Sequence, residues 1–230
     1  INTLSILIPT YNNGCLELVR SLQAQASHLP HFTYEILVAD DGSTDVASIE
    51  SNRSINTLDH CHYIPREHNE GRAAIRNFLA QQAQYPWLLF VDSNMQVIYP
   101  DYLSNYQNST ACNVIYGGYK IPQEQKQLKC NLRYLFESAS TQNANAQERQ
   151  AHPYKNFHTS NFIIQRDILL KYPFDERFRY YGYEDVLFGK TIKENQITIV
   201  HVDNPLGYEH FIGNYAFISK TEESLRTLYQ

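Results

Sequence analysis

Trp87-Leu88-Leu89-Phe90-Val91-Asp92-Ser93-Asn94 is an uncharged apolar run that ends abruptly in a carboxylate, a hydroxyl and an amide. Such a run predicts a strand buried on both faces, as in a parallel sheet covered by helices. Open sheets of this class bind ligands at the carboxyl ends of their strands, where Asp92 and Asn94 would offer oxygen ligands to a hard cation. The same residue types also favour helix caps and turns, so this stretch alone leaves a plain turn open.

The segments before this run alternate between strand and helix patterns. We expect strands at residues 4–9, 34–39 and 62–64, and helices at residues 16–29, after Asp45 and at residues 72–84. The alternation predicts a parallel sheet with right-handed crossovers. Polar turns follow the first, second and fourth strands, so we expect three polar clusters along one edge of the sheet: Thr10-Tyr11-Asn12, Asp40-Asp41 and Asp92-Ser93-Asn94.

The second half of the chain has a less regular pattern. We expect strands at residues 113–121, with a Gly117-Gly118 break, 159–164 and 197–202. Helices are expected within residues 127–150 and at 166–172, 184–194 and from 213 onward. We interpret residues 138–150 as a mobile or partner-facing excursion, with a plain solvated helix as the alternative. Without a linker or repeat, the sequence predicts one domain over residues 1–230, with sub-regions 1–112 and 113–230.

Bulk composition excludes several classes of protein. The 230 residues carry a formal net charge of −5 without a basic block, which argues against nucleic acid as the main partner. Four scattered cysteines without a CxxC pair are typical of a reducing compartment, so we expect a cytoplasmic protein. The apolar runs are too short to span a bilayer, which leaves peripheral association with the inner face of a membrane open. Because Ile1 stands in place of a methionine, an upstream segment is compatible with the sequence.

Five motifs, taken together, resemble the family 2 glycosyltransferases of the GT-A fold, which use nucleotide sugars. They occur in the family's order over roughly residues 4–210: Ser5-Ile6-Leu7-Ile8-Pro9-Thr10-Tyr11-Asn12, Val38-Ala39-Asp40-Asp41-Gly42-Ser43-Thr44-Asp45, Asn69-Glu70-Gly71 with Arg76-Asn77, Phe90-Val91-Asp92-Ser93-Asn94, and Gly182-Tyr183-Glu184-Asp185-Val186. The resemblance implies a Rossmann-like, mostly parallel sheet covered by helices, with a smaller mixed sub-region on the acceptor side. Residues 1–112 would bind the nucleotide sugar, and residues 113–230 would bind the acceptor and carry the catalytic acids.

The resemblance also implies a nucleotide site. Pro9, Thr10 and Tyr11 would line the base and ribose, and Asp40, with Asp41 nearby, would accept a hydrogen bond from the base N–H of uracil. A cap for the following helix is the alternative for these two acids. Arg72 would reach the diphosphate, because a guanidinium matches phosphate geometry, unless it is a surface arginine. Asp92 and Ser93 complete the predicted nucleotide contacts, whereas Arg76 is expected to support the sheet.

A divalent metal, Mn²⁺ or Mg²⁺, is the implied cofactor. Asp92-Ser93-Asn94 aligns with the family's Asp-X-Asp motif, but its last residue is a neutral amide, so we expect a weaker metal site. His210 is the further ligand that the resemblance implies, although a lone histidine is more often a packed or surface residue. We assign His201, inside an apolar strand, to structure, and we leave open whether His158 and His152 face the acceptor.

Glu184 and Asp185 open a predicted helix, where acids are also favoured by the helix dipole alone. By resemblance, Asp185 is the general base that takes the proton of an acceptor hydroxyl, and Glu184 binds acceptor or donor hydroxyls. Attack opposite the nucleotide would invert the anomeric configuration. The sequence thus predicts transfer from a UDP-type donor to a saccharide or lipid-linked acceptor, as in polysaccharide biosynthesis. The alternatives are a non-catalytic saccharide-binding or partner-organising domain, and a sugar-phosphate nucleotidyltransferase, whose Gly-rich basic loop is missing after the first strand.

Overall fold

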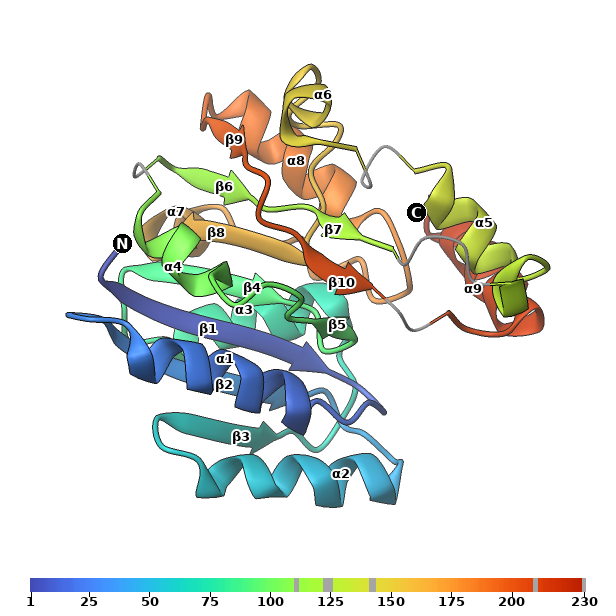
Figure 1. The fold of residues 1–230 in the computed structure, drawn as a ribbon. Helices are drawn as coiled ribbons and strands as arrows, with labels where there is room; N and C mark the ends of the chain where they lie inside the picture. The colour runs from blue at the N-terminus through green and yellow to red at the C-terminus, as the bar shows by residue number, and fades with distance from the viewer. Residues whose placement is uncertain (110–111, 122–125, 141–143, 209–210, 229–230) are drawn as a thin grey trace.

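A central sheet with helices on both faces organises the chain (Figure 1). The computed structural model describes residues 1–109, 112–121, 126–140, 144–208 and 211–228. The strands are β1 (Thr3–Thr10), β2 (Thr33–Asp40), β3 (Cys61–Pro65), β4 (Trp87–Val91), β5 (Met95–Gln96), β6 (Val114–Tyr116), β7 (Tyr119–Lys120), β8 (Asn161–Gln165), β9 (Ile199–His201) and β10 (Leu206–Tyr208). The helices are α1 (Leu16–His28), α2 (Val46–Arg53), η1 (Ser54–Thr57), α3 (Arg72–Gln82), α4 (Tyr102–Gln107), η2 (Lys126–Leu128), α5 (Leu132–Ser138), α6 (Ala146–Gln150), α7 (Arg166–Lys171), α8 (Glu184–Glu194) and α9 (Asn214–Thr227).

Within the described residues, seven strands form the main sheet in the order β3-β2-β1-β4-β8-β6-β9. The strands β3, β2, β1 and β4 are mutually parallel, as the alternating pattern predicts. In contrast, β8 runs antiparallel to both β4 and β6. A second sheet, in the order β5-β10-β7, lies beside the first. The predicted fold class, a mostly parallel sheet with a smaller mixed region, is confirmed.

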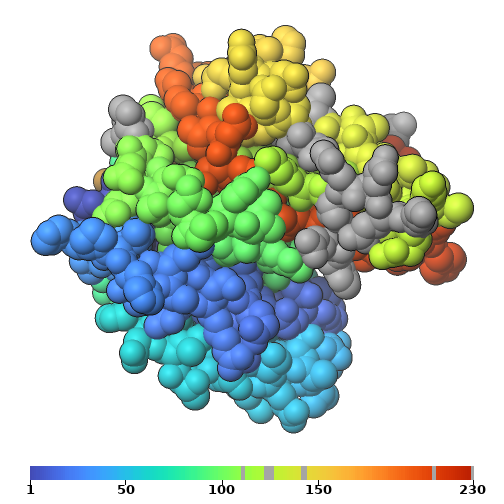
Figure 2. Space-filling model, in the orientation of Figure 1, coloured from blue at the N-terminus to red at the C-terminus, as the bar shows by residue number. Residues whose placement is uncertain are grey.

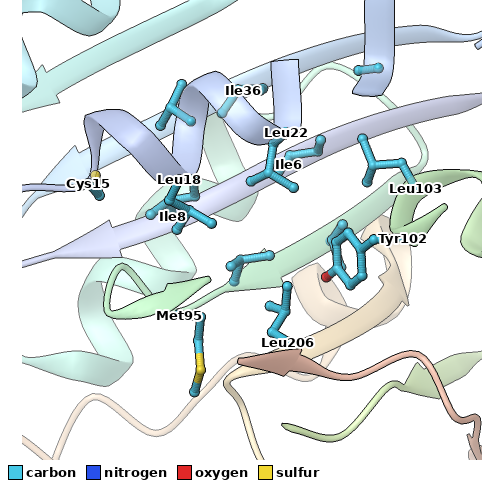
Figure 3. Packing of buried hydrophobic residues seen from close by; sticks show 14 of the residues in the cluster. Ile6, Ile8, Cys15, Leu18, Leu22, Ile36, Met95, Tyr102, Leu103 and Leu206 are labelled. Atoms are coloured by element: carbon cyan, nitrogen blue, oxygen red, sulfur yellow. The ribbon is translucent and has the colours of Figure 1, made fainter. Parts of the chain in front are cut away.

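Alternation along β1 explains the layers. Ile6 and Ile8 face one side of the sheet and pack with Leu22 of α1 and Tyr102 of α4 (Figure 3). Leu7 faces the other side, in the cluster that contains residues of α3, α7 and α8. Because side chains on a strand alternate between its two faces, an all-apolar strand requires cover on both faces. The strand ends are therefore the part of the sheet left open to ligands.

The Gly117-Gly118 break divides the predicted strand at residues 113–121 into β6 and β7, which belong to different sheets. A Cβ atom on Gly117 would lie 2.2 Å from the hydroxyl oxygen of Tyr106, so only glycine fits this crossing. Gly118 has a φ of +76°, a conformation that favours glycine. The break therefore turns the chain from the main sheet into the small one.

The interpretation of residues 138–150 as an excursion is wrong for their last part. Arg149 of α6 is 2% exposed, and its guanidinium donates to the carbonyl oxygen of Val202 at 2.8 Å and to that of Gly117 at 3.4 Å. This arginine ties α6 to the chain segments around β6 and β9. Residues 141–143 lie outside the described part of the chain.

Helices α5 and α9 pack together and project from one side of the molecule (Figures 1 and 2). Their contact includes the rings of Phe136 and Phe217, whose centroids are 5.8 Å apart. Helix α9 also holds the loop that precedes α8, because Glu223 accepts from the backbone N–H of Tyr181 at 3.0 Å. In the parts of the chain that the structure describes, no helix combines the length and apolarity needed to cross a membrane.

Candidate functional site

A cavity of about 640 Å³ lies at the carboxyl ends of β1 and β4 and extends to the first turn of α8. It brings together turns that are far apart in the sequence, as the convergence of parallel strand ends predicts. Ten of the predicted site residues line it: Pro9, Thr10, Tyr11, Asp41, Arg72, Asp92, Ser93, Asn94, Glu184 and Asp185. Asp40 is not part of this lining, and His210 lies outside the described residues.

The turn after β1 is fixed to both neighbouring turns. The side-chain oxygen of Asn12 accepts from the backbone N–H groups of Thr44 at 2.8 Å and Asp45 at 2.9 Å. The amide of Asn13 donates to the carbonyl oxygen of Ser93 at 2.9 Å and to its hydroxyl at 3.1 Å. These amides hold the three turns in one arrangement before any ligand binds. Asn12 belongs to one of the predicted polar clusters, but the sequence predicted no role for either asparagine.

The two acids after β2 differ in position. Asp40 is buried and accepts from the backbone N–H of Ser43 at 2.8 Å and from the hydroxyl of Tyr63. Asp41 reaches the cavity wall, where it accepts from the backbone N–H of Gly71 at 2.8 Å and pairs with Arg66 at 3.1 Å. Burial raises the pKa of Asp41, and these donors oppose the rise. Asp40 therefore fixes the turn, and Asp41 is the acid that faces the cavity.

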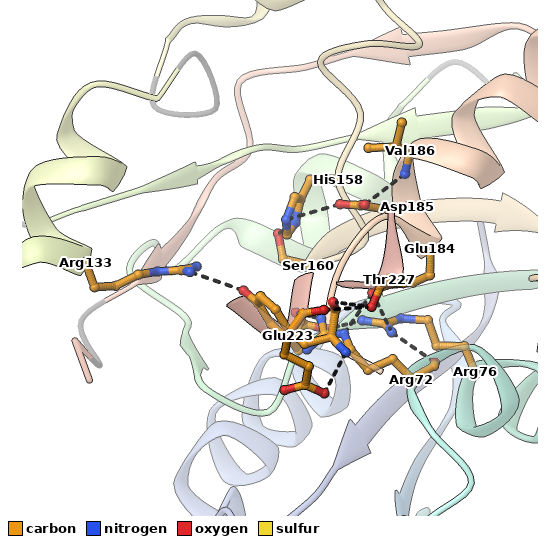
Figure 4. Close-up of polar contacts among 12 residues, drawn as sticks. Arg72, Arg76, Arg133, His158, Ser160, Glu184, Asp185, Val186, Glu223 and Thr227 are labelled. Carbon is orange, nitrogen blue, oxygen red and sulfur yellow. Dashed lines mark hydrogen bonds and ion pairs between the residues drawn. The ribbon is translucent and has the colours of Figure 1, made fainter. Parts of the chain in front are cut away.

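Four charged side chains form a network along the floor of the cavity, and Figure 4 labels three of them, Arg72, Arg76 and Glu184. Arg72 donates from Nε to Glu184 at 2.7 Å and lies 3.6 Å from Asp92. Arg76, one helical turn later, lies 2.7 Å from Asp92 and 3.7 Å from Glu184. The network contains two cations and two anions, so each carboxylate is balanced by guanidinium groups on one face of α3.

The side chains of this network differ in how deeply they are buried. Arg76 and Glu184 have side chains only 2% and 4% exposed, whereas that of Arg72 is 36% exposed. Burial alone would raise the pKa of Glu184, but Arg72 and Arg76 outweigh it and hold the pKa at about 2. Arg72 experiences the reverse balance: burial would lower its pKa, and the carboxylates of Glu184 and Asp92 raise it. Glu184 and Arg72 are therefore both charged at neutral pH.

Asp185 follows Glu184 but faces a different set of groups. One of its carboxylate oxygens accepts from the backbone N–H of Val186 at 2.8 Å, and the other lies 3.3 Å from Nε2 of His158. Its side chain is 15% exposed, and it lines the cavity. Within the described residues, Asp185 is thus a carboxylate that is partly open to a ligand and has no arginine partner.

Charged residues from α5 and α9, together with Tyr180 and Tyr181 of the loop before α8, form the far wall of the cavity. Arg133 pairs with Glu137 at 2.5 Å and donates to the hydroxyl of Tyr181 at 3.1 Å. Lys220 lies 5.3 Å from the centroid of the Tyr181 ring. Burial lowers the pKa of Lys220, and the positive charges of Arg72 and Arg133 lower it further. This wall was not predicted, because no sequence pattern relates α5 and α9 to the strand ends.

The oxygen ligands at the predicted metal position fit a site in which a bound substrate would supply the remaining ligands of the metal. Asp92 and Asn94 both line the cavity, and Mg²⁺ ordinarily uses one or two carboxylates together with substrate phosphates and water. Among the described residues there is no group of three His, Cys, Asp or Glu side chains arranged to hold a metal. Because Asp92 already pairs with two arginines, part of its charge is taken before a metal binds.

The family model for glycosyl transferase family 2 matches residues 5–172. The chain belongs to this family. The match covers the strand-end motifs and most of the sheet, and it confirms the predicted family and class of enzyme, a glycosyltransferase domain.

The curated relatives of this glycosyltransferase domain match part of it. An uncharacterized glycosyltransferase of Rickettsia felis is 37% identical over 92 residues, which are 39% of this chain and 14% of that protein. A Rickettsia conorii relative, also named an uncharacterized glycosyltransferase, is 36% identical over 93 residues, again 14% of its length. The matched stretch therefore spans a small part of these relatives.

Solved structures show the same fold at low sequence identity. The structure of S. aureus TarS 1-349 in complex with UDP-GlcNAc has a TM-score of 0.63 at 21% identity, covering 92% of this chain and 59% of that one. The mannosyltransferase PcManGT from Pyrobaculum calidifontis, in complex with GDP-Man and Mn²⁺, has a TM-score of 0.65 at 16% identity, covering 96% of this chain and 61% of that one. At these identities the similarity establishes the fold.

The structure also gives the positions of the three other histidines considered in the sequence, His152, His158 and His201. His201 is buried, and its Nε2 lies 2.9 Å from the carbonyl oxygen of Pro153. Burial lowers its pKa to about 4, so it is a neutral side chain of the interior, as expected. His158 lines the cavity, whereas His152 is not part of its lining.

Proposed function

We propose that this domain transfers a sugar from a nucleoside diphosphate donor, of UDP type, to a hydroxyl of a saccharide or lipid-linked acceptor, with inversion at the anomeric carbon. The observation that carries the proposal is a single cavity in which the strand-end turns, including Asp92, face the same space as Asp185. A donor site and a proton acceptor are the two requirements for a single displacement at a sugar carbon.

Asp185 is the general base in this proposal. As the acceptor oxygen forms its bond to the anomeric carbon, its O–H bond breaks and the proton passes to Asp185. The bond between the anomeric carbon and the diphosphate oxygen breaks at the same time, and the diphosphate leaves with that electron pair. The position of Asp185 supports this role, because its carboxylate is partly exposed and no arginine pairs with it among the residues that the structure describes. Glu184, buried beneath Arg72, would act by holding that arginine in place.

The nucleotide would bind at the ends of β1, β2 and β4, where Pro9, Thr10 and Tyr11 line the cavity. We assign the contact with the base N–H to Asp41. A carboxylate can accept about four hydrogen bonds, and three donors already approach Asp41, namely Arg66 and the N–H groups of residues 70 and 71. Asp40 would support this contact through the turn that it fixes.

Arg72 would contact the diphosphate, together with Ser93. It is the partly exposed cation of the network, and a guanidinium pairs well with phosphate oxygens. A divalent ion, Mn²⁺ or Mg²⁺, would be held by Asp92 and Asn94, with His210 as the predicted third ligand. When bound, such an ion stabilises the negative charge that develops on a leaving diphosphate.

The test of Asp185 is its replacement by asparagine. D185N should reduce sugar transfer to a small residual rate while UDP still binds with the wild-type Kd in calorimetry, because the substitution removes the proton acceptor and leaves the strand ends intact. D167N is the matched control, since Asp167 is an exposed acid in the first turn of α7, outside the cavity, and it should leave transfer unchanged. Full transfer activity in D185N would refute the assignment.

The stereochemistry of the product tests the single displacement separately. The anomeric proton of the product, observed by NMR, should show the configuration opposite to that of the donor. Retention would require two displacements and a covalent or otherwise protected intermediate, and would defeat the mechanism even if D185N were inactive.

A further inference from the structure

His158 precedes β8 and lies against the predicted base. Its Nε2 atom is 3.3 Å from Oδ2 of Asp185, and its Nδ1 atom is 3.2 Å from the hydroxyl oxygen of Ser160 (Figure 4). Both His158 and Asp185 line the cavity, whereas Ser160 is fully buried. One imidazole ring therefore connects the interior of the domain to the carboxylate that faces the ligand space.

Ser160 is a rigid anchor for this ring. Its carbonyl oxygen accepts from the backbone N–H of Asp92 at 3.1 Å, so it is fixed to the end of β4. When its hydroxyl donates to Nδ1 of His158, the neutral imidazole carries its proton on Nε2, and that N–H points at Asp185. The hydrogen bond made by one ring nitrogen thus sets the role of the other.

Asp185 has no second side-chain partner among the described residues. Its other oxygen is held by the N–H of Val186, the next residue on the same helix. Tyr183, the residue before the first residue of α8, has a φ of +67°. The chain therefore enters α8 through a left-handed turn and not through a side-chain cap. His158 is therefore the group from another element that orients this carboxylate.

We infer that His158 is a positioning residue: held by its contact with Ser160, it donates from Nε2 to Asp185 and holds the base in its reactive orientation. This inference rests on the proposed role of Asp185. The ring of Tyr119, 6.1 Å away at 70°, packs against His158 and limits its movement.

Two substitutions separate the contacts of the ring. In H158N the amide lies near the position of Nδ1, so it keeps the contact with Ser160 and loses Asp185. In H158Q the longer side chain places its amide near Nε2 and keeps the donation to Asp185. We expect H158N to lower kcat by about 10- to 100-fold, the range that loss of orienting partners costs metal-binding side chains. The donor KM and the UDP Kd should stay at wild-type values, and H158Q should recover most of kcat.

A double-mutant cycle distinguishes this inference from the proposed function. In the D185N background, H158N should add no further loss to the residual rate, because both substitutions remove the same function. Wild-type kcat in D185N would overturn the base assignment itself. An inactive D185N together with wild-type kcat in H158N would overturn the role of His158 alone. Equal losses of kcat in H158N and H158Q would show that the donation from Nε2 to Asp185 does not matter, and would also overturn it.

Discussion

Replacing Glu184 by glutamine tests whether the network beneath the cavity stabilises the domain through charge. The substitution keeps the shape of the side chain and an oxygen that can accept from Nε of Arg72. It removes the one buried carboxylate between Arg72 and Arg76, so a buried cation loses part of its compensation. Removal of one partner from a buried ion pair is costly because the other charge stays in a medium of low polarity.

The pKa of Glu184 gives the magnitude. It falls from an ordinary value of 4.5 to about 2 in the folded protein. Since one pKa unit corresponds to about 1.4 kcal/mol, the charged form contributes about 3 kcal/mol to the free energy of unfolding at pH 7. A group with a lowered folded pKa contributes above its unfolded pKa, and the contribution is lost as the pH falls through the folded value. At pH 3.5 roughly 1 kcal/mol of it should be gone, because the unfolded chain then largely binds the proton and the folded one does not.

Urea unfolding at the two pH values measures this difference. We expect E184Q to be less stable than wild type by about 3 kcal/mol at pH 7, and by about 2 kcal/mol at pH 3.5. The control is E194Q at the other end of α8, where Glu194 and Lys190 form an exposed pair at 3.8 Å that should contribute less than about 1 kcal/mol. A loss below about 1 kcal/mol at pH 7, or an equal loss at both pH values, would refute the electrostatic account of the network.

Three further predictions concern other parts of the domain. In calorimetric titrations, UDP should bind more tightly in the presence of Mn²⁺ than in the presence of a chelator. The difference should be modest, because Asp92 is already paired with two arginines. Equal affinities under the two conditions would contradict the proposed metal site. G71A should lower the unfolding free energy by at least about 1 kcal/mol in urea, because Gly71 has a φ of +99° and its Cβ would lie 2.7 Å from the carbonyl oxygen of Arg179; a wild-type midpoint would contradict this. Burial raises the pKa of the Cys15 thiol to about 12, so a thiol reagent at pH 8 should label the exposed Cys130 at once and Cys15 only after unfolding.

The strand ends were predictable because two simple patterns suffice to locate them. An apolar run such as residues 87–91 requires burial on both faces, and parallel strands present their carboxyl ends at one edge. The polar turns after β1, β2 and β4 therefore had to meet. Asp92 and Asp41 both line the resulting cavity. What the patterns could not decide was which of two adjacent acids faces it, since that depends on the hydrogen bonds of Tyr63 and Ser43 to Asp40.

The role of Arg76 could have been found from its spacing. Residues four apart lie on the same face of a helix, so Arg72 and Arg76 had to point in the same direction. Support of the sheet was expected for Arg76, whereas it is buried beside the predicted metal ligand. The far wall offered no comparable signal, because Arg133 and Lys220 meet at Tyr181 only through the packing of α5 against α9.

The different burial of the two arginines gives them different roles towards a donor. Arg76 is fixed, with a side chain 2% exposed and a 2.7 Å contact to Asp92, so it balances that carboxylate whether or not a ligand is present. Arg72 is more exposed and its contact to Asp92 is looser, at 3.6 Å. A diphosphate adds negative charge to a network that is already balanced, and Arg72 is the member that can turn towards it. When Arg72 moves away from Asp92, one carboxylate oxygen of Asp92 becomes free to bind a metal ion. We therefore expect donor binding and metal binding at this site to strengthen each other.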